Sequence, residues 1–383
     1  MLLGVVWHVT VPFTSVAKGW WIAEYPQSSE WYYYLYFFLK SFRMPLFFVI
    51  AGFFANMLYV RRGGWGFIKH RTVRIAIPLV AGLLTLIPII HCLYIYRRFH
   101  GNILELYPEF LDTCANYLLS DRFVNNFNPA HLWFLYYLIL LYVISVLISL
   151  LFSRLAIPHL NARVDSIISW LIRTPLKPFV LAAIITIPLY FMSIWNTDVP
   201  SALFPLEWHI LFYYGIFFTF GWLVYRKADE VGNFTGHRSL FVVLATIALP
   251  ISLYFQQYEN QVSHEWYAAL KLLALFSLAC LTCFTVFGLI SVFHKFLSSY
   301  NRTIRYISDS SYWLYLIHLP IVMYLQVLFA DYTMSRMMKF LAMNGITFLV
   351  CFITYGLFVR YTFIGSILNG PKHRKLTLKK QLK

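Results

Sequence analysis

Long apolar segments alternate with short polar connections along nearly the whole chain. About 20 mostly apolar residues suffice for a helix to cross the hydrocarbon core of a bilayer, and most of these segments carry Trp or Tyr at their ends, as interfacial anchors do. The pattern predicts an all-α, polytopic membrane helix bundle with about ten transmembrane helices. The apolar segments lie at about Met1–Ala17, Trp31–Tyr59, Val73–Ile95, Leu132–Leu151, Phe179–Trp195, His209–Tyr225, Leu240–Phe255, Tyr267–Val292, Ser311–Phe329 and Phe340–Thr362.

Charged residues are distributed unevenly between the connections. Because cytoplasmic loops carry an excess of lysine and arginine, we expect both termini in the cytoplasm. Two termini on the same side require an even number of spans, which agrees with ten. The other connections hold most of the acids. Lysine and arginine dominate every second connection, through Arg61, Arg62, Lys69, Arg71 and Arg74, then Arg154, Arg163, Arg173 and Lys177, then Arg226, Lys227 and Arg238, and then Lys295, Arg302 and Arg305.

The composition supports a membrane protein and argues against other classes. Of the 383 residues, 60% are hydrophobic and 12% are charged, whereas soluble domains are about half apolar and a quarter charged. The net charge of +16 follows from the cytoplasmic basic residues, so no nucleic-acid partner is expected. We expect one transmembrane domain, residues 1–365, followed by a basic cytoplasmic tail, residues 366–383.

No sequence feature predicts a metal, a bound cofactor or a signal peptide. Cys280 and Cys283 have the spacing of a redox pair, but they lie in an apolar run, where small apolar residues are expected and no disulfide is implied. No phosphate-binding glycine loop, serine elbow or zinc motif occurs. The first segment, Met1–Ala17, is short for a full span and lacks the charged start and cleavage site of a signal peptide.

Two polar side chains fall near the middle of predicted spans. Arg43 lies within the stretch SFRMPLFFVIAGFF, and His8 lies in the first apolar segment. Helical rise places Arg43 about 18 Å from the outer start of its helix and His8 about 10 Å from Met1. An arginine at the bilayer centre costs about 2.5–3.5 kcal/mol on insertion scales, so it normally faces the bundle interior or a wet cavity. A histidine suits general-base catalysis and an arginine suits an anion or oxyanion, so the pair indicates acyl or phosphoryl transfer.

Several further residues are candidates for the same site. His318 lies about 10 Å into the ninth predicted helix, where a catalytic role and hydrogen bonding to carbonyls freed by Pro320 are both open. His131 opens the fourth predicted helix, where an interfacial or substrate-orienting role is expected. Four cytoplasmic arginines are candidates for holding a phosphorylated donor or for setting the topology, namely Arg71, Arg74, Arg302 and Arg305.

At these residues the chain resembles the acyltransferase 3 family of integral-membrane O-acyltransferases. The matching stretches are GVVWHV around His8, SFRMPLFFVIAGFF around Arg43, RTVRIAIP from Arg71, HLWFLYYLILL from His131 and SDSSYWLYLIHLP containing His318. The resemblance covers essentially the whole chain. It implies a cytosolic acyl-CoA donor, no bound cofactor, and a glycan hydroxyl as acceptor, usually on the outer side.

The resemblance also implies roles for individual residues. His8 matches the first-helix histidine that is considered essential, Arg43 matches the second-helix arginine, and His318 occupies the ninth-helix motif. The family usually has an Asp or Arg upstream of the first histidine, at a position that here falls before Met1, so we expect the natural start to lie further upstream. Within the family the chain most resembles the branch thought to add succinyl groups to osmoregulated periplasmic glucans.

We therefore expect a membrane O-acyltransferase that moves a succinyl or acetyl group from cytosolic acyl-CoA to a hydroxyl of a periplasmic or cell-envelope glucan. The expected location is the bacterial inner membrane. The expected partners are the lipid bilayer, acyl-CoA, the periplasmic glucan and glucan synthesis proteins. Two alternatives stay open, a transporter or flippase for a glycan or lipid-linked sugar, and a scaffold of a glucan synthase complex.

The expected mechanism divides the work between the two sides of the membrane. Arg71, Arg74 or Arg302 hold the phosphates of the donor. Arg43 polarises the thioester carbonyl or binds the acyl group, while His8 removes the proton from the acceptor hydroxyl. Direct transfer and a covalent acyl-histidine relay are both compatible with the sequence.

Overall fold

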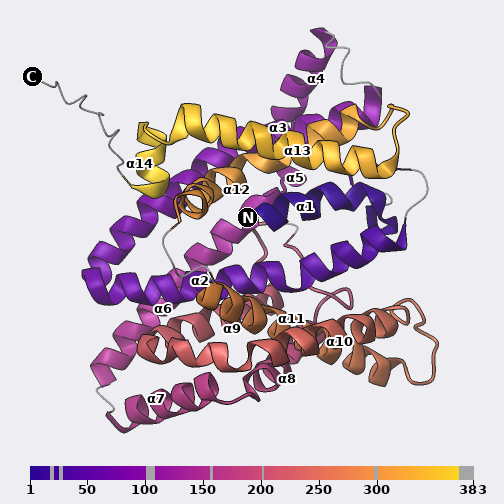
Figure 1. The fold of residues 1–383 in the computed structure, drawn as a ribbon. Helices are drawn as coiled ribbons and strands as arrows, with labels where there is room; N and C mark the ends of the chain where they lie inside the picture. The colour runs from indigo at the N-terminus through magenta and orange to yellow at the C-terminus, as the bar shows by residue number, and fades with distance from the viewer. Residues whose placement is uncertain are drawn as a thin grey trace, which may run out of the picture.

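The computed structural model describes residues 1–17, 21–25, 29–100, 108–155, 158–200, 202–296 and 301–370. Within these residues the chain forms helices and no strands (Figure 1), which confirms the all-α prediction. The α-helices are α1 (Leu2–Thr10), α2 (Glu30–Arg71), α3 (Ile77–His100), α4 (Pro108–Leu118), α5 (Asp121–Asn125), α6 (Trp133–Leu155), α7 (Pro158–Arg173), α8 (Lys177–Tyr190), α9 (Trp208–Tyr225), α10 (Arg238–Gln256), α11 (Tyr267–Phe296), α12 (Arg302–Leu328), α13 (Arg336–Thr354) and α14 (Phe363–Asn369). Short 3-10 or π-helical pieces are η1 (Val11–Phe13), η2 (Ser15–Ala17), η3 (Thr72–Ala76), η4 (Ala130–Leu132), η5 (Ala228–His237) and η6 (Tyr355–Val359).

Many of these helices are long and apolar enough to cross a membrane. The described residues contain seven such helices, or up to eight if the bent pair α7–α8 counts as one span. The segment Leu2–Phe13 is apolar but shorter. A multi-pass membrane protein is confirmed, while the count of about ten spans and the location of the termini stay predictions. The expected tail, residues 366–383, begins inside α14, and residues 371–383 lie outside the described part.

The second and third predicted spans form one helical segment, Glu30–Ile95, of 66 residues. At the rise of an α-helix this segment is about 100 Å long, several times the thickness of the hydrocarbon core. Gly63 interrupts it with φ 69° and ψ 174°, a backbone conformation that is essentially restricted to glycine. Figure 1 shows the chain reversing its direction between α2 and α3, so the segment can supply two spans.

The long helix α2 packs closely against α9 at the centre of the bundle. A Cβ atom added to Gly52 of α2 would overlap the carbonyl of Phe218, and one added to Gly221 of α9 would overlap the carbonyl of Val49. Small residues allow helix backbones to approach this closely inside a membrane. Asn56, one turn after Gly52, donates from Nδ2 to a backbone carbonyl of α9 at 2.7 Å. The contact fixes the position of α2 in the bundle.

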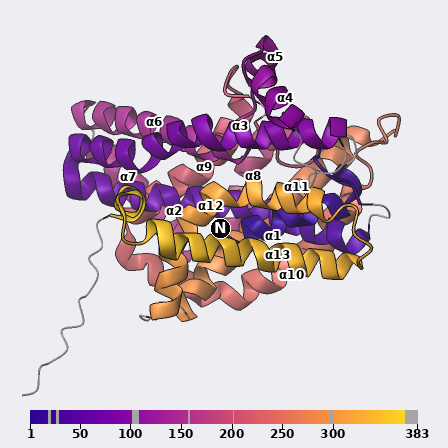
Figure 2. The same ribbon diagram turned by 90° about the horizontal axis from the view of Figure 1, so that it is seen from above.

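A second group of helices lies opposite α2 and α9. Helix α12 contacts α1, α3 and α13, and Figure 2 shows α1, α12 and α13 grouped across the middle of the molecule. In the same view α4 and α5 project from the bundle beside α3. The space between α2 on one side and α1, α3 and α12 on the other holds most of the polar side chains predicted for the site.

A buried lysine stabilises the sharp bend between α7 and α8. The chain bends by 113° between the two helices. Lys177 is 1% exposed and donates from Nζ to the carbonyl oxygens of Ile172 at 2.7 Å and Thr174 at 3.0 Å. These are carbonyls at the end of α7, which have no partner within the helix. The sequence analysis counted Lys177 among the loop charges that set the topology, and the structure gives it this local role as well.

The close contact of α2 with α9 predicts a specific sensitivity to an added methyl group. Gly221→Ala forces the two backbones apart, and overpacking of this kind costs about 1–3 kcal/mol, so we expect a lower thermal unfolding midpoint in detergent. Gly345→Ala is the matched control, because it also adds a methyl group inside a helix, where the new Cβ would have no heavy atom within 4 Å. Equal midpoints for the two variants would contradict the packing described here.

Candidate active site

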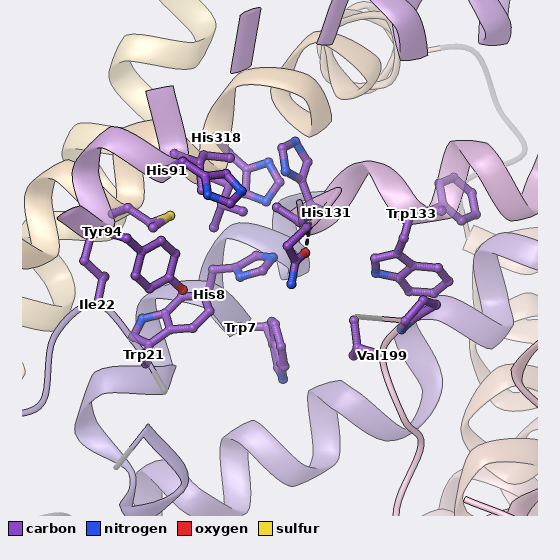
Figure 3. A pocket seen from close by; sticks show the side chains of 18 of the residues that line it. Trp7, His8, Trp21, Ile22, His91, Tyr94, His131, Trp133, Val199 and His318 are labelled. Carbon is purple, nitrogen blue, oxygen red and sulfur yellow. Dashed lines mark hydrogen bonds between the residues drawn. The ribbon is translucent and has the colours of Figure 1, made fainter. Parts of the chain in front are cut away.

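A cavity of about 1550 Å³ lies between these two groups of helices. Four residues predicted for the site line it, namely His8, Arg43, His131 and His318. They come from α1, α2, η4 and α12, and Figure 3 shows the three histidines turned toward the same space. The sequence therefore identified the residues that meet at this cavity, although it could not show which groups each would contact.

The three imidazoles form a row with His318 in the middle. Its ring centroid lies 5.2 Å from that of His8 and 5.3 Å from that of His131. The described residues contain no group of three or more His, Cys, Asp or Glu placed to hold a metal ion. The chemistry available to the three imidazoles depends on which of their ring nitrogens carry protons.

Backbone carbonyls determine the tautomer of His318. Its Nδ1 lies 2.9 Å from the carbonyl oxygen of Leu314 and 2.8 Å from that of Tyr315. Because a carbonyl oxygen only accepts, Nδ1 must carry the proton and Nε2 must hold a lone pair. The Nε2 atom is buried and has no hydrogen-bond partner among the described residues. His318 thus offers an unprotonated nitrogen in the cavity.

The tautomer of His131 follows from a proline one turn further along α12. Pro320 has no N–H group, so the carbonyl of Leu316 lacks its usual helical donor. His131 supplies one, with Nε2 at 2.9 Å from that oxygen, which leaves a lone pair on Nδ1. The sequence analysis left open whether His318 bonds the carbonyls freed by Pro320. In the structure His131 takes this carbonyl, and His318 bonds two others.

His8 is held in place through its backbone. Gln326, which is 0% exposed, donates from Nε2 to the carbonyl oxygen of His8 at 2.7 Å. The Oε1 atom of Gln326 accepts from Nε1 of Trp21 at 2.9 Å. The Nδ1 atom of His8 is buried without a hydrogen-bond partner in the described part of the chain. One buried amide therefore fixes α1 against α12 and leaves the imidazole of His8 free to react.

The sequence analysis missed Gln326, although a signal for it exists. An amide inside an apolar run must find hydrogen-bond partners, because a buried unpaired polar group is costly. Gln326 follows His318 by eight residues, so the two lie about two turns apart on the same face of α12. This spacing would have marked Gln326 as a residue of the same site.

Arg43 carries a positive charge that no acid of the described residues neutralises. No described carboxylate lies within salt-bridge distance of it, and its buried Nη1 atom has no hydrogen-bond partner there. The guanidinium carbon lies 4.5 Å from the ring centroid of Trp7, a cation–π contact. The ring of Trp7 also lies 4.6 Å from that of His8. Arg43 and His8 therefore face one cavity, with an unsatisfied cation beside an imidazole.

The four arginines predicted to lie in the cytoplasm and hold the donor do not line this cavity. The guanidinium carbon of Arg71 lies 4.7 Å from the ring centroid of Tyr142, and its buried Nε atom has no hydrogen-bond partner among the described residues. Arg74 accepts a hydrogen bond at its backbone carbonyl from the hydroxyl of Tyr312 at 2.7 Å. Arg302 and Arg305 lie exposed in the first turn of α12. Their predicted role in binding a phosphorylated donor stays a prediction.

Comparison with known proteins gives one family and one group of relatives. The acyltransferase domain family matches residues 1–356. The chain is 24% identical to glucans biosynthesis protein C of Salmonella paratyphi B, over 97% of this chain and 92% of that protein. The same values hold for the proteins of that name from Salmonella dublin and Salmonella typhi. No solved structure matches the chain significantly.

The carbonyl freed by Pro320 predicts a coupling between two substitutions. His131→Leu leaves the buried Leu316 carbonyl without a donor, which costs about 1–3 kcal/mol. Pro320→Ala restores a backbone N–H for that carbonyl, so we expect His131→Leu to lower the unfolding midpoint clearly in the parent protein and much less in the Pro320→Ala protein. The same loss in both backgrounds would contradict the assigned hydrogen bond. His264→Leu is the control. His264 lies in an exposed connection, so its replacement should have the same effect on the midpoint in the parent and in the Pro320→Ala protein.

Proposed function

We propose that this protein moves a succinyl or acetyl group from cytosolic acyl-CoA to a hydroxyl of a cell-envelope glucan. The premise is that the chain belongs to the acyltransferase 3 family and is a membrane O-acyltransferase. The family assignment favours the enzyme over the transporter and the scaffold that the sequence left open. The glucan acceptor is suggested by the name of the relatives. A cytosolic donor and an envelope acceptor both point to the bacterial inner membrane as the location.

One observation carries the proposal, which is that a guanidinium that no described acid neutralises shares one cavity with unprotonated imidazole nitrogens. In an acyl transfer the acceptor hydroxyl must lose a proton, and the carbonyl oxygen of the thioester gains negative charge. His8 takes the proton, and the Nε2 lone pair of the neighbouring His318 stabilises the imidazolium that forms. Arg43 stabilises the developing oxyanion or a carboxylate on the acyl group.

The atoms and electrons of the reaction balance without a further reagent. The acceptor oxygen forms a bond to the carbonyl carbon as its proton passes to His8. The carbon–sulfur bond of the thioester then breaks. The thiolate of coenzyme A takes the proton back from the imidazolium and leaves as the thiol. A relay through an acyl-histidine divides the same change into two steps. Trapping labelled acyl groups on the protein in the absence of acceptor distinguishes the relay from direct transfer.

The donor side of the proposal rests on Arg71, Arg74, Arg302 and Arg305. A cluster of arginines suits the phosphates of coenzyme A, and the unpaired Nε of Arg71 supports this use. The cavity reaches Tyr315 but includes none of the four arginines. A thioester arriving from their side must therefore displace side chains such as Tyr312 and Tyr315 before it meets Arg43.

The role of His8 predicts a loss of turnover. His8→Ala should lower the rate of label transfer from radiolabelled acyl-CoA to glucan by about 10² to 10⁴, the usual contribution of a general base. The measurement uses membranes with equal amounts of each protein, with His264→Ala as the control for removing a histidine elsewhere. A His8→Ala protein with the parent rate would remove His8 from the mechanism.

The role of Arg43 predicts a difference between two donors. A succinyl group carries a carboxylate, and a bidentate arginine–carboxylate contact is strong and directional. Arg43→Gln should therefore reduce kcat/KM for succinyl-CoA more than for acetyl-CoA, and Arg43→Lys should restore only part of the loss, because lysine acts as a point charge. Equal losses of kcat/KM with both donors would instead indicate that Arg43 stabilises only the developing oxyanion.

A further inference from the structure

The cavity extends well beyond the histidines, into an arm walled by α3, α4 and α5. Its lining includes Tyr94 and His91 of α3 together with residues of α4 and α5. Helix α4 packs on α3, where the thiols of Cys114 and Cys92 lie near one another. Figure 2 shows α4 and α5 projecting together from the edge of the bundle beside α3. The arm thus connects the row of imidazoles to a separate helical segment.

One face of α4 and its C-terminal turn is polar and faces this arm. Thr113, Asn116 and Tyr117 of α4 line the cavity, and their spacing of three and four residues puts them on one side of the helix. Ser120, which follows α4 with an extended backbone, lines the cavity as well. Asp112 and Leu119, at other positions of the same segment, do not line it and are exposed. The division of the segment into a cavity face and an outward face is therefore visible in the sequence itself.

The groups on this face suit a polyhydroxylated ligand. An amide or a hydroxyl can both donate and accept hydrogen bonds, as sugar hydroxyls require. The side chain of Asn116 is exposed and makes no hydrogen bond with any other residue that the structure describes. The ring of Tyr117 stacks on that of His91 with centroids 6.1 Å apart, so these rings are held in position to pack on the apolar face of a sugar.

The charges along the arm are compatible with such a ligand even after it has been acylated. Lys40, Arg97 and Arg122 line the cavity together with a single acid, Glu24. An acceptor that already carries succinyl carboxylates would therefore not be repelled. Tyr94 links this part to the reacting groups, since Figure 3 shows it in the same wall as Trp21 and Ile22, with its ring turned into the cavity near His8.

We infer that the α4 face formed by Thr113, Asn116 and Tyr117, together with Ser120 just after the helix and Tyr94 near the imidazoles, is the binding subsite for a carbohydrate acceptor. This inference rests on the proposed acyl transfer to a glucan and names the residues that select the acceptor. The subsite holds one part of the glycan while a hydroxyl of a neighbouring sugar unit reaches His8. A lipid-linked acceptor would require an apolar channel at this level, whereas the α4 face is polar.

The test separates acceptor binding from chemistry. Radiolabelled succinyl-CoA and a defined glucose oligomer are supplied to the purified full-length protein, and KM for the oligomer, KM for the donor and kcat are measured. Asn116→Ala should raise KM for the oligomer about tenfold, equivalent to the loss of about 1.4 kcal/mol of binding free energy, with kcat and KM for the donor unchanged. Asp112→Ala, on the outward face of the same helix, should leave all three values unchanged.

A second variant guards against a change in folding. Asn116→Trp adds bulk to the α4 face of the arm, so transfer to the oligomer should fall further while succinyl-CoA is still bound with the parent KM. Label on the oligomer with the parent KM in both variants would overturn the subsite and leave the acyltransferase intact. No label on the oligomer from the parent protein, with label instead in extracted lipid, would overturn both the subsite and the proposed glucan acceptor.

Discussion

A guanidinium held inside a bundle of membrane helices, with no carboxylate partner among the described residues, is the feature on which the rest of the structure depends. The contact of Arg43 with Trp7 contributes on the order of 0.5–2 kcal/mol, less than the cost of placing an arginine at mid-membrane, about 2.5–3.5 kcal/mol on insertion scales. Water in the cavity and an incoming anion have to supply the remainder. The arginine can stay at this depth only if α2 cannot slide or rotate, and the interlocked backbones at Gly52 and Gly221 prevent that motion. The glycine contact and the buried cation are therefore two parts of one constraint.

Backbone carbonyls orient His318 and His131, and no acidic side chain of the described residues takes part. A carboxylate beside His318 or His131 would orient the ring equally well, but it would also neutralise Arg43 and remove the attraction for an anionic group. Carbonyl oxygens orient the rings without adding a charge. The proline in α12 is part of this arrangement, because a missing N–H leaves the Leu316 carbonyl available to His131. Helix α12 thus lacks one internal hydrogen bond, and the freed carbonyl fixes the tautomer of His131 in the cavity.

The sequence predicted the polar residues at membrane depth but not the contacts between them. Arg43 and His8 stood out because charge and imidazole are rare in long apolar runs, and burial in a shared cavity follows from that cost. The partner of the His8 backbone, Gln326, comes from a segment more than 300 residues away, and no local pattern in one chain reveals such a pair. The number of spans was harder to predict, since Gly63 and the bend at Lys177 change how helices are divided without changing their hydropathy. The polar face of α4 has a period that the sequence does show, yet only the structure connects it to the histidines.

The arrangement of α12 explains how two substrates predicted to come from opposite sides can meet without a continuous channel. Tyr312, Tyr315 and His318 follow one another at intervals of three residues along this helix, and the first two hydroxyls bond the carbonyls of Arg74 and His131 at 2.7 Å each. In this state the cavity is closed toward the arginines and lined by polar groups toward α4. Admitting a thioester would break these two hydrogen bonds, each worth about 0.5–1.5 kcal/mol net, so the closed state is favoured by only about 1–3 kcal/mol from this source. Binding several phosphates to arginines can offset a difference of that size, so the proposed donor can open the path to Arg43. While that donor is absent, the cavity stays closed toward the arginines.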